Sequence, residues 1–294
     1  MAMSQHGKGL AIGLIGIIAL SPEALLIRLV SVDHWTIVVW RGALLCIGLL
    51  VASTLTARSW RVVPAIGSAG LLVALLFGLQ TVGFVFSITT TTVANTLIAM
   101  SAAPLFAALL EAALFKDHIS ARLWTVIAVA MFGIILMFSG SVGSGALQGD
   151  LAGLATAAAL GTALVIIRRN KDRTMVPAMA LGGLVASLLA LPFSEPASVT
   201  STDIRYLAIS GLVVLPMGFG LLAVAPRYIL APEVGLITLL ETILGPLWVW
   251  LVLAEQPDRS TIVGGGVVIL ALTLNSYLGI RETSRVVPTE PRVA

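Results

Sequence analysis

Residues Ala94–Phe138 read ANTLIAMSAAPLFAALLEAALFKDHISARLWTVIAVAMFGIILMF. This is an apolar segment with Pro104 inside it, then a short charged hinge, then a second apolar segment. Residues Val234–Leu278 repeat the same order of elements as VGLITLLETILGPLWVWLVLAEQPDRSTIVGGGVVILALTLNSYL, with Pro246 in the place of Pro104. An interrupted apolar helix in each half of a chain is typical of secondary transporters built from repeats.

The composition places the chain in a membrane. Hydrophobic residues make up 58% of the 294 residues and charged residues only 11%, whereas soluble domains carry about 25% charged residues. A water-soluble core of this length could not hide so much apolar surface. We therefore predict an all-α integral membrane protein, with the lipid bilayer as its surroundings.

We predict ten transmembrane helices, because a span needs roughly 20 mostly apolar residues. They cover residues 9–30, 35–56, 64–87, 91–115, 121–140, 150–168, 177–193, 204–226, 232–254 and 260–280. The glycine-rich link 140–145 divides the chain into a first five-helix repeat, residues 1–145, and a second, residues 146–294, with a short tail.

Lysine and arginine predict the orientation, since they concentrate in cytoplasmic segments. With both termini in the cytoplasm, 13 of the 17 Lys and Arg residues lie on that side, three on the other and one, Arg41, in a helix. Five spans per half is an odd number, so the second half enters the membrane upside down. We expect two inverted repeats around a central cavity.

Three stretches resemble the drug/metabolite transporter superfamily of the EamA, ten-helix type. They are Trp40-Arg41-Gly42, the run Phe84–Ser120, and Leu222–Glu255 with its Tyr228 and closing Leu-Ala-Glu. The first charged turn departs from the family pattern, because Phe-Lys-Asp-His stands in place of Gly-Glu-Arg. The resemblance implies an inner-membrane exporter of small metabolites, with spans 1, 3, 4, 6, 8 and 9 around the cavity.

Two of the glutamates in the predicted spans are candidate site residues, because an ionisable group inside a span costs at least ~2.5–3.5 kcal/mol and usually faces the bundle interior or water. Glu23 could bind a substrate ammonium or carry a proton; alternatively it is a rim carboxylate paired with Arg28. Glu241 could be a proton site or a substrate-ammonium contact; alternatively it is a protonated glutamate hydrogen-bonded to a neighbouring helix.

Several other side chains are candidates for the cavity wall. Gln80 and Phe84 share a helix face, since they are four residues apart, and could contact substrate or only pack between helices. Asn95 could be a cavity group or a helix–helix contact, with Met100 as an adaptable wall residue. Trp248 could stack on cargo or anchor at the interface.

Arginine and proline supply two further hypotheses. Arg41 could clamp a substrate carboxylate or pair within the bundle. Pro104, Pro216 and Pro246 are predicted bending points for alternating access, because proline removes a helical hydrogen bond.

Other functional classes find little support. One cysteine, Cys46, and three scattered histidines predict no metal site, and we expect no catalytic residue, cofactor or nucleic-acid partner. An intramembrane enzyme would need a catalytic group, yet no aspartate or histidine is predicted deep in a span. A channel would need a selectivity filter. The absence of a Walker motif argues against direct ATP use.

The sequence thus predicts a secondary transporter that exports small amphipathic metabolites, amino acids above all, aromatic or other neutral ones. The alternative is proton-coupled efflux of drugs or lipophilic cations. The residues leave cargo, proton coupling, direction and oligomeric state open.

Overall fold

The computed structural model describes residues 5–57, 67–115, 120–143, 145–170, 175–225, 228–229 and 231–286, and these residues are helical with short connections and no strand. Ten helical stretches are long and apolar enough to cross a membrane, which confirms all ten predicted spans. They are Gln5–Arg28, His34–Ser53, Gly67–Thr90, Val93–Leu114, Ala121–Ser139, Leu147–Arg169, Val176–Phe193, Ser201–Leu222, Glu233–Leu253 and Arg259–Ile280.

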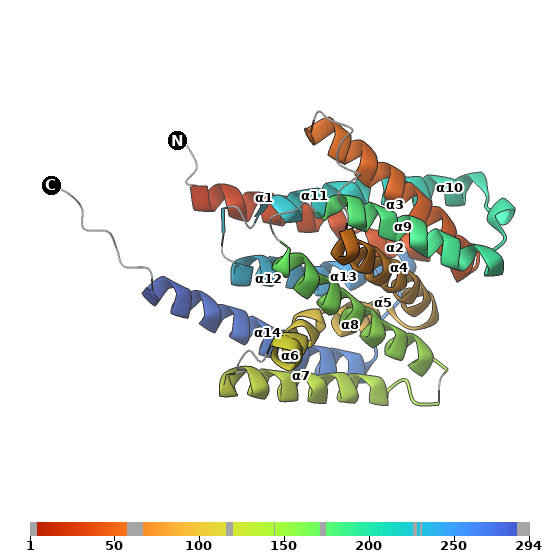
Figure 1. Ribbon diagram of the computed structural model, residues 1–294. Coiled ribbons are helices and arrows are strands. Elements are labelled where there is room, and N and C mark those ends of the chain that lie inside the picture. Colours follow the sequence, from red (N-terminus) through yellow and green to blue (C-terminus); the bar gives the residue numbers. More distant parts are fainter. Residues whose placement is uncertain are drawn as a thin grey trace.

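Six of the ten spans are formed by one main helix each (Figure 1). These are α3 (His34–Ala57), α4 (Gly67–Thr90), α7 (Ala121–Ser139), α8 (Leu147–Arg169), α9 (Val176–Ala190) and α14 (Arg259–Val286), which form spans 2, 3, 5, 6, 7 and 10. Two short 3-10 turns, Leu191–Phe193 and Pro196–Ser198, follow α9.

The other four spans are interrupted. Span 1 is divided into α1 (Gln5–Leu20) and α2 (Glu23–Arg28), span 4 into α5 (Val93–Met100) and α6 (Ala103–Phe115), and span 9 into α12 (Ala231–Leu239) and α13 (Glu241–Leu253). Span 8 consists of α10 (Ser201–Ala208), a π-helical segment at Ile209–Val214 and α11 (Leu215–Val224).

Proline accounts for much of this pattern, because it lacks an N–H group and clashes with the preceding turn. Pro22 lies in the break of span 1, and Pro104 is the second residue of α6, directly after the break of span 4. Pro216 follows the π-helical segment of span 8. Pro246 lies within α13, whereas the break of span 9 falls one to two turns earlier, at Leu240.

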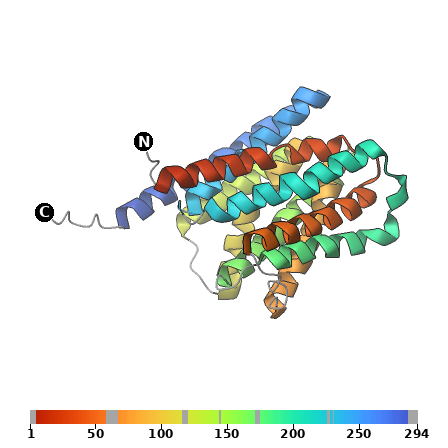
Figure 2. The same cartoon turned by 90° about the horizontal axis from the view of Figure 1, so that it is seen from above.

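Long helices pack in pairs drawn from the two halves of the chain. In both views α3 lies beside α9 and α1 beside α11, and α7 also packs on α14 and α4 on α8 (Figures 1 and 2). In span numbers these pairs are 2 with 7, 1 with 8, 5 with 10 and 3 with 6. If each span is replaced by the corresponding span of the other half, the same four pairs result. The inverted relation between the halves, and the division at residue 145, stay predictions.

Glycine allows two of these pairs to touch through their backbones. A Cβ atom on Gly42 of α3 would lie 2.4 Å from the carbonyl oxygen of Gly183 in α9. A Cβ atom on Gly264 of α14 would lie 2.4 Å from the carbonyl oxygen of Gly133 in α7. Small residues at helix crossings are the means by which membrane helices approach closely.

The outer surface is apolar, as lipid contact requires. Large hydrophobic side chains on α7 and α14, such as Phe132, Ile135 and Leu270, are more than 60% exposed. Apolar clusters with buried residues lie between the helices. The protein is therefore a multi-pass membrane protein.

Both described ends of the chain, Gln5 and Val286, lie on one side of the bundle, at the left of Figure 1. We call this side the terminal face and the other side, where α2 and α13 end, the opposite face. The hinge Lys116-Asp117-His118 lies outside the described residues. The same holds for several of the basic residues counted above: Arg58, Arg61, Lys171, Arg173, Arg227 and Arg292.

Candidate functional site

A buried ion pair joins the first two spans. The Nε atom of Arg41, in α3, donates a hydrogen bond to Oε1 of Glu23 over 2.7 Å, and Nη2 of Arg41 contacts the same oxygen. Glu23 is 4% exposed and Arg41 3% exposed. The break at Ser21 and Pro22 makes Glu23 the first residue of α2, so its carboxylate lies at the interruption of span 1.

The same guanidinium contacts a third predicted residue, Phe84. The Cζ atom of Arg41 lies 5.2 Å from the centre of the buried Phe84 ring in α4, within the range of a cation–π interaction. The Nη1 atom of Arg41 is also buried, and it has no hydrogen-bond partner among the described residues. One end of this guanidinium is therefore paired with Glu23, and the Nη1 end has no acceptor among the described residues.

A second carboxyl group belongs to this region. Glu241 is half-buried, begins α13, and lies close enough to Glu23 for an electrostatic interaction. The helices that carry them, α2 and α13, pack on each other. We call Glu23, Arg41, Phe84 and Glu241 the charged centre; it combines two carboxyl groups with one guanidinium.

Three further predicted residues lie around the breaks or one turn from the centre. The indole Nε1 of Trp248, in α13, donates to Ser21 Oγ over 2.9 Å, which links α13 to the break of span 1. Met100 ends α5 and packs against the apolar cluster that contains Phe84. Gln80 is buried in α4, one turn from Phe84.

The alternative pairing of Glu23 with Arg28 is wrong. Glu23 pairs with Arg41, whereas Nη2 of Arg28 lies 2.8 Å from Glu255 Oε2. Residues five apart on an α-helix are turned well away from each other, since helical neighbours are three or four apart. Pairing within the bundle, the alternative considered for Arg41, is what the structure has.

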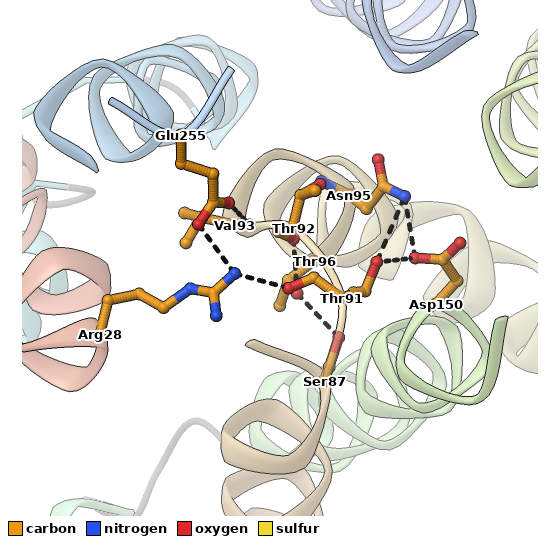
Figure 3. A network of polar contacts seen from close by, with 9 residues as sticks. All are labelled: Arg28, Ser87, Thr91, Thr92, Val93, Asn95, Thr96, Asp150 and Glu255. Carbon is orange, nitrogen blue, oxygen red and sulfur yellow. Dashed lines mark hydrogen bonds and ion pairs between the residues drawn. The ribbon is translucent and has the colours of Figure 1, made fainter. Parts of the chain in front are cut away.

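The opposite face carries a second polar group around the start of α5 (Figure 3). Besides its contact with Glu255, Nη2 of Arg28 donates to the carbonyl oxygen of Thr91 over 2.8 Å. Glu255 Oε1 accepts the backbone N–H of Val93 over 2.9 Å. We call Arg28 and Glu255 the clamp, since they hold the first turn of α5 between span 1 and span 9.

On the other side of α5 the polar contacts are fully buried. Asp150 Oδ1, in α8, accepts from Thr91 Oγ1 over 2.5 Å and from Asn95 Nδ2 over 2.9 Å. Thr261, in α14, donates to Asn95 Oδ1 over 2.6 Å. We call Thr91, Asn95, Asp150 and Thr261 the anchor; Asn95 lies here and not in the charged centre.

Sequence reasoning missed Asp150 and Glu255. Asp150 was predicted at the very start of a span, yet it is 0% exposed inside the first turn of α8, and its Oδ2 has no partner among the described residues. Glu255 was predicted to be part of the short charged hinge of the second copy. Its place follows from Ala254, which ends α13 in the left-handed region at φ 56° and turns the chain back over α5.

Comparisons with known proteins agree with this architecture. Residues 147–277 match the EamA-like transporter family. A search of curated proteins finds no match. Among solved structures 23 chains match. One is a crystal structure that superposes with a TM-score of 0.66, at 14% identity over 93% of this chain and 99% of its own, which shows the fold alone.

The family match covers the second half of the chain, and the first half supplies the other five of the ten membrane-crossing helices. Members of the family are transporters. The match and the ten membrane-crossing helices together support an EamA-type protein of the drug/metabolite transporter superfamily, whose members are membrane transporters of small substrates.

Proposed function

We propose that the protein is a secondary transporter that exports neutral amino acids, aromatic ones among them, across the inner membrane by alternating access. The charged centre is the proposed cargo site. The single observation that carries the proposal is the Arg41 guanidinium, buried between Glu23 and Phe84 with unused donors at Nη1.

The centre offers partners for both ends of an amino acid. The N–H groups at Arg41 Nη1 suit a carboxylate, which arginine binds through its planar fork. Glu241 or Glu23 suits the ammonium group. Phe84, Met100, Trp248 and Gln80 would contact the side chain of the cargo, because aromatic rings and methionine form adaptable apolar surfaces.

The interrupted spans supply the proposed movement. Short helices such as α2 and α13 can turn about the breaks at Pro22 and Leu240 without bending a continuous helix. Pro104, Pro216 and Pro246 lie at or near the interruptions of spans 4, 8 and 9. Helices broken at the binding site recur in secondary transporters, whose halves rock around it.

Orientation and localisation belong to the proposal as well. The excess of Lys and Arg in the segments predicted to share a side with the termini favours a cytoplasmic position for the terminal face. Both termini would then lie in the cytoplasm, and the clamp would lie on the external side. Export is the movement of cargo from the terminal face to the opposite face.

Counterflow into proteoliposomes tests the proposal. Vesicles loaded with unlabelled phenylalanine, leucine or alanine should take up the labelled amino acid with saturation. Glu241→Gln should reduce the rate about tenfold or more, since a hydrogen bond to a charged group contributes about 1.5–3 kcal/mol. Glu111→Gln is the matched control, because Glu111 faces Arg168 near the terminal face. Absence of flux with every amino acid, from folded wild-type protein, would refute amino-acid cargo.

A second candidate function rests on the charge of the centre. Two carboxyl groups against one guanidinium leave a place for one positive charge, which a proton or a lipophilic cation could fill. Proton-coupled efflux of such cations predicts that tetraphenylphosphonium drives proton movement in vesicles, and that Glu241→Gln abolishes it. Amino-acid counterflow that is indifferent to a pH gradient and to tetraphenylphosphonium would exclude this function.

A further inference from the structure

We propose that the clamp is the gate of the opposite face, and that the gate opens when α2 and the end of α13 leave α5, which stays fixed to α4, α8 and α14. The proposal rests on alternating access but not on the identity of the cargo. It assigns unlike roles to the two sides of one short helix, α5.

The polar contacts on the moving side are few, and they are partly open to water. Arg28 and Glu255 have side chains 23% and 24% exposed. Their bonds to α5 are the two already described, from Arg28 to the Thr91 carbonyl and from the Val93 N–H to Glu255. An ion pair with access to water contributes little stability, so this clamp can open and reclose.

The fixed side is held by contacts that exclude water. Asn95 and Asp150 are 3% and 0% exposed, and their bonds join α5 to α8 and α14. A hydrogen bond of 2.8 Å between the buried hydroxyls of Ser87 and Thr96 joins α5 to α4. Separating these groups inside a membrane would leave several of them without partners, which is costly.

Glycine brings a neighbouring helix close to α5 on both sides, so the difference between the two sides lies in their polar contacts. A Cβ atom on Gly153, in α8, would lie 3.3 Å from Ala99 Cβ. A Cβ atom on Gly245, in α13, would lie 2.3 Å from Leu97 Cδ1 of α5 and 3.9 Å from Ala24 Cβ of α2. Ala24 is 3% exposed and Ala99 0% exposed. Opening at the clamp would uncover Ala24 and leave Ala99 buried.

Thiol labelling tests this directly. Cys46, the one cysteine of the chain, is replaced by serine, and either Ala24→Cys or Ala99→Cys is introduced. A membrane-impermeant maleimide is then added to the opposite face of sealed vesicles. We expect slow labelling of the Ala24→Cys protein, made up to about fivefold faster by Arg28→Ala or Glu255→Ala, the range for a partly exposed ion pair.

The controls separate opening from unfolding. The Ala99→Cys protein should stay unlabelled in both clamp variants. Arg205→Ala removes an exposed arginine from the same face and should leave both rates unchanged. The double variant Arg28→Ala with Glu255→Ala should gain less than the product of the single gains, because the two residues act as one unit.

Two results would overturn the proposal. Unchanged labelling of the Ala24→Cys protein in both clamp variants would mean that the clamp does not close this face. Faster labelling at both positions would mean that α5 leaves its neighbours. The assay needs no cargo, so a failure of amino-acid counterflow would refute the proposed function and leave this inference standing.

Discussion

Trp248 and Ser21, which are 227 residues apart, are joined by a hydrogen bond of 2.9 Å from the indole to the hydroxyl. The bond ties the outer half of span 9 to the break of span 1, next to Glu23. Ser21 is itself anchored, because its hydroxyl donates to the carbonyl oxygen of Ile18 over 2.9 Å. The hydrogen bond thus links α13 to the interruption of span 1, directly before α2.

We predict that the stability losses caused by Trp248→Phe and Ser21→Ala are not additive, because both substitutions remove the same hydrogen bond. Hydrogen bonds between membrane helices average about 0.6 kcal/mol and reach about 1.7 kcal/mol. The interaction free energy from a double-mutant cycle, measured by unfolding in mixed micelles, should lie in that range. Purely additive losses would show that the contact contributes no stability.

For the buried pair of Glu23 and Arg41 we predict that removing one partner lowers stability more than removing both. Arg41→Met leaves the Glu23 carboxylate buried without a cation, which costs about 3–5 kcal/mol. Glu23→Leu combined with Arg41→Met should recover most of that stability, since both charges are gone. Thermal midpoints in detergent would show the recovery. Counterflow should remain absent from the double variant, and near wild-type transport there would contradict a role in cargo binding.

At the crossing of α7 and α14 we predict that replacing Gly264 by alanine lowers the stability of the protein, whereas replacing Gly266 by alanine does not. A Cβ atom on Gly264 would lie 2.4 Å from the Gly133 carbonyl oxygen and 2.6 Å from the Met137 nitrogen, both backbone atoms. Gly264→Ala should therefore destabilise by about 1–3 kcal/mol, the usual cost of overpacking. At Gly266 a Cβ atom meets nothing within 4 Å, so Gly266→Ala should be neutral or stabilise by about 0.5–1 kcal/mol. Thermal midpoints measured side by side would check both expectations, and equal shifts would contradict them.

We predict that Asp150→Asn, which removes only the charge, destabilises the protein less than Asp150→Ala, which also removes the hydrogen-bond acceptor. Asp150→Asn keeps an oxygen that can accept from Thr91 and Asn95, so it should cost little stability. Asp150→Ala leaves both donors buried and unpaired, at about 1–3 kcal/mol for each. Chemical unfolding of the two variants checks the order. A larger loss with asparagine than with alanine would mean that the carboxylate charge, and not the hydrogen bonds, holds the anchor.

The sequence was sufficient for the spans because each is a long apolar run bounded by charge, Pro or Gly. Glu23, Phe84 and Glu241 could be found as polar or aromatic residues in such runs, and the structure brings them to one place. The partner of Glu23 could not be assigned in this way, because pairing between spans depends on how helices rotate and cross. Pro246 indicated which span would be interrupted, but not where. The break falls at Leu240, whereas the carbonyl group left unbonded by the proline lies four residues before Pro246.

Residues at the ends of spans were the hardest to interpret. Asp150 was predicted as the first residue of a span and Glu255 as part of a charged hinge, since short-range patterns place such residues at caps and hinges. Their contacts are with Thr91, Asn95, Arg28 and Val93, between 55 and 227 residues away. Asn95 gave no signal that would separate a cargo contact from a helix–helix contact, because an amide suits both. The two roles are distinguished by the positions of α8 and α14, whose side chains bond to Asn95.

The backbone of Ala254 adds a conformational cost to the position of Glu255 over α5. A left-handed conformation costs an L-residue other than glycine about 1–2 kcal/mol, and Ala254 holds it at φ 56° while Glu255 reaches back to α5. Glycine adopts a positive φ without this steric penalty, so the methyl group of Ala254 makes the turn that carries the clamp less stable than it could be.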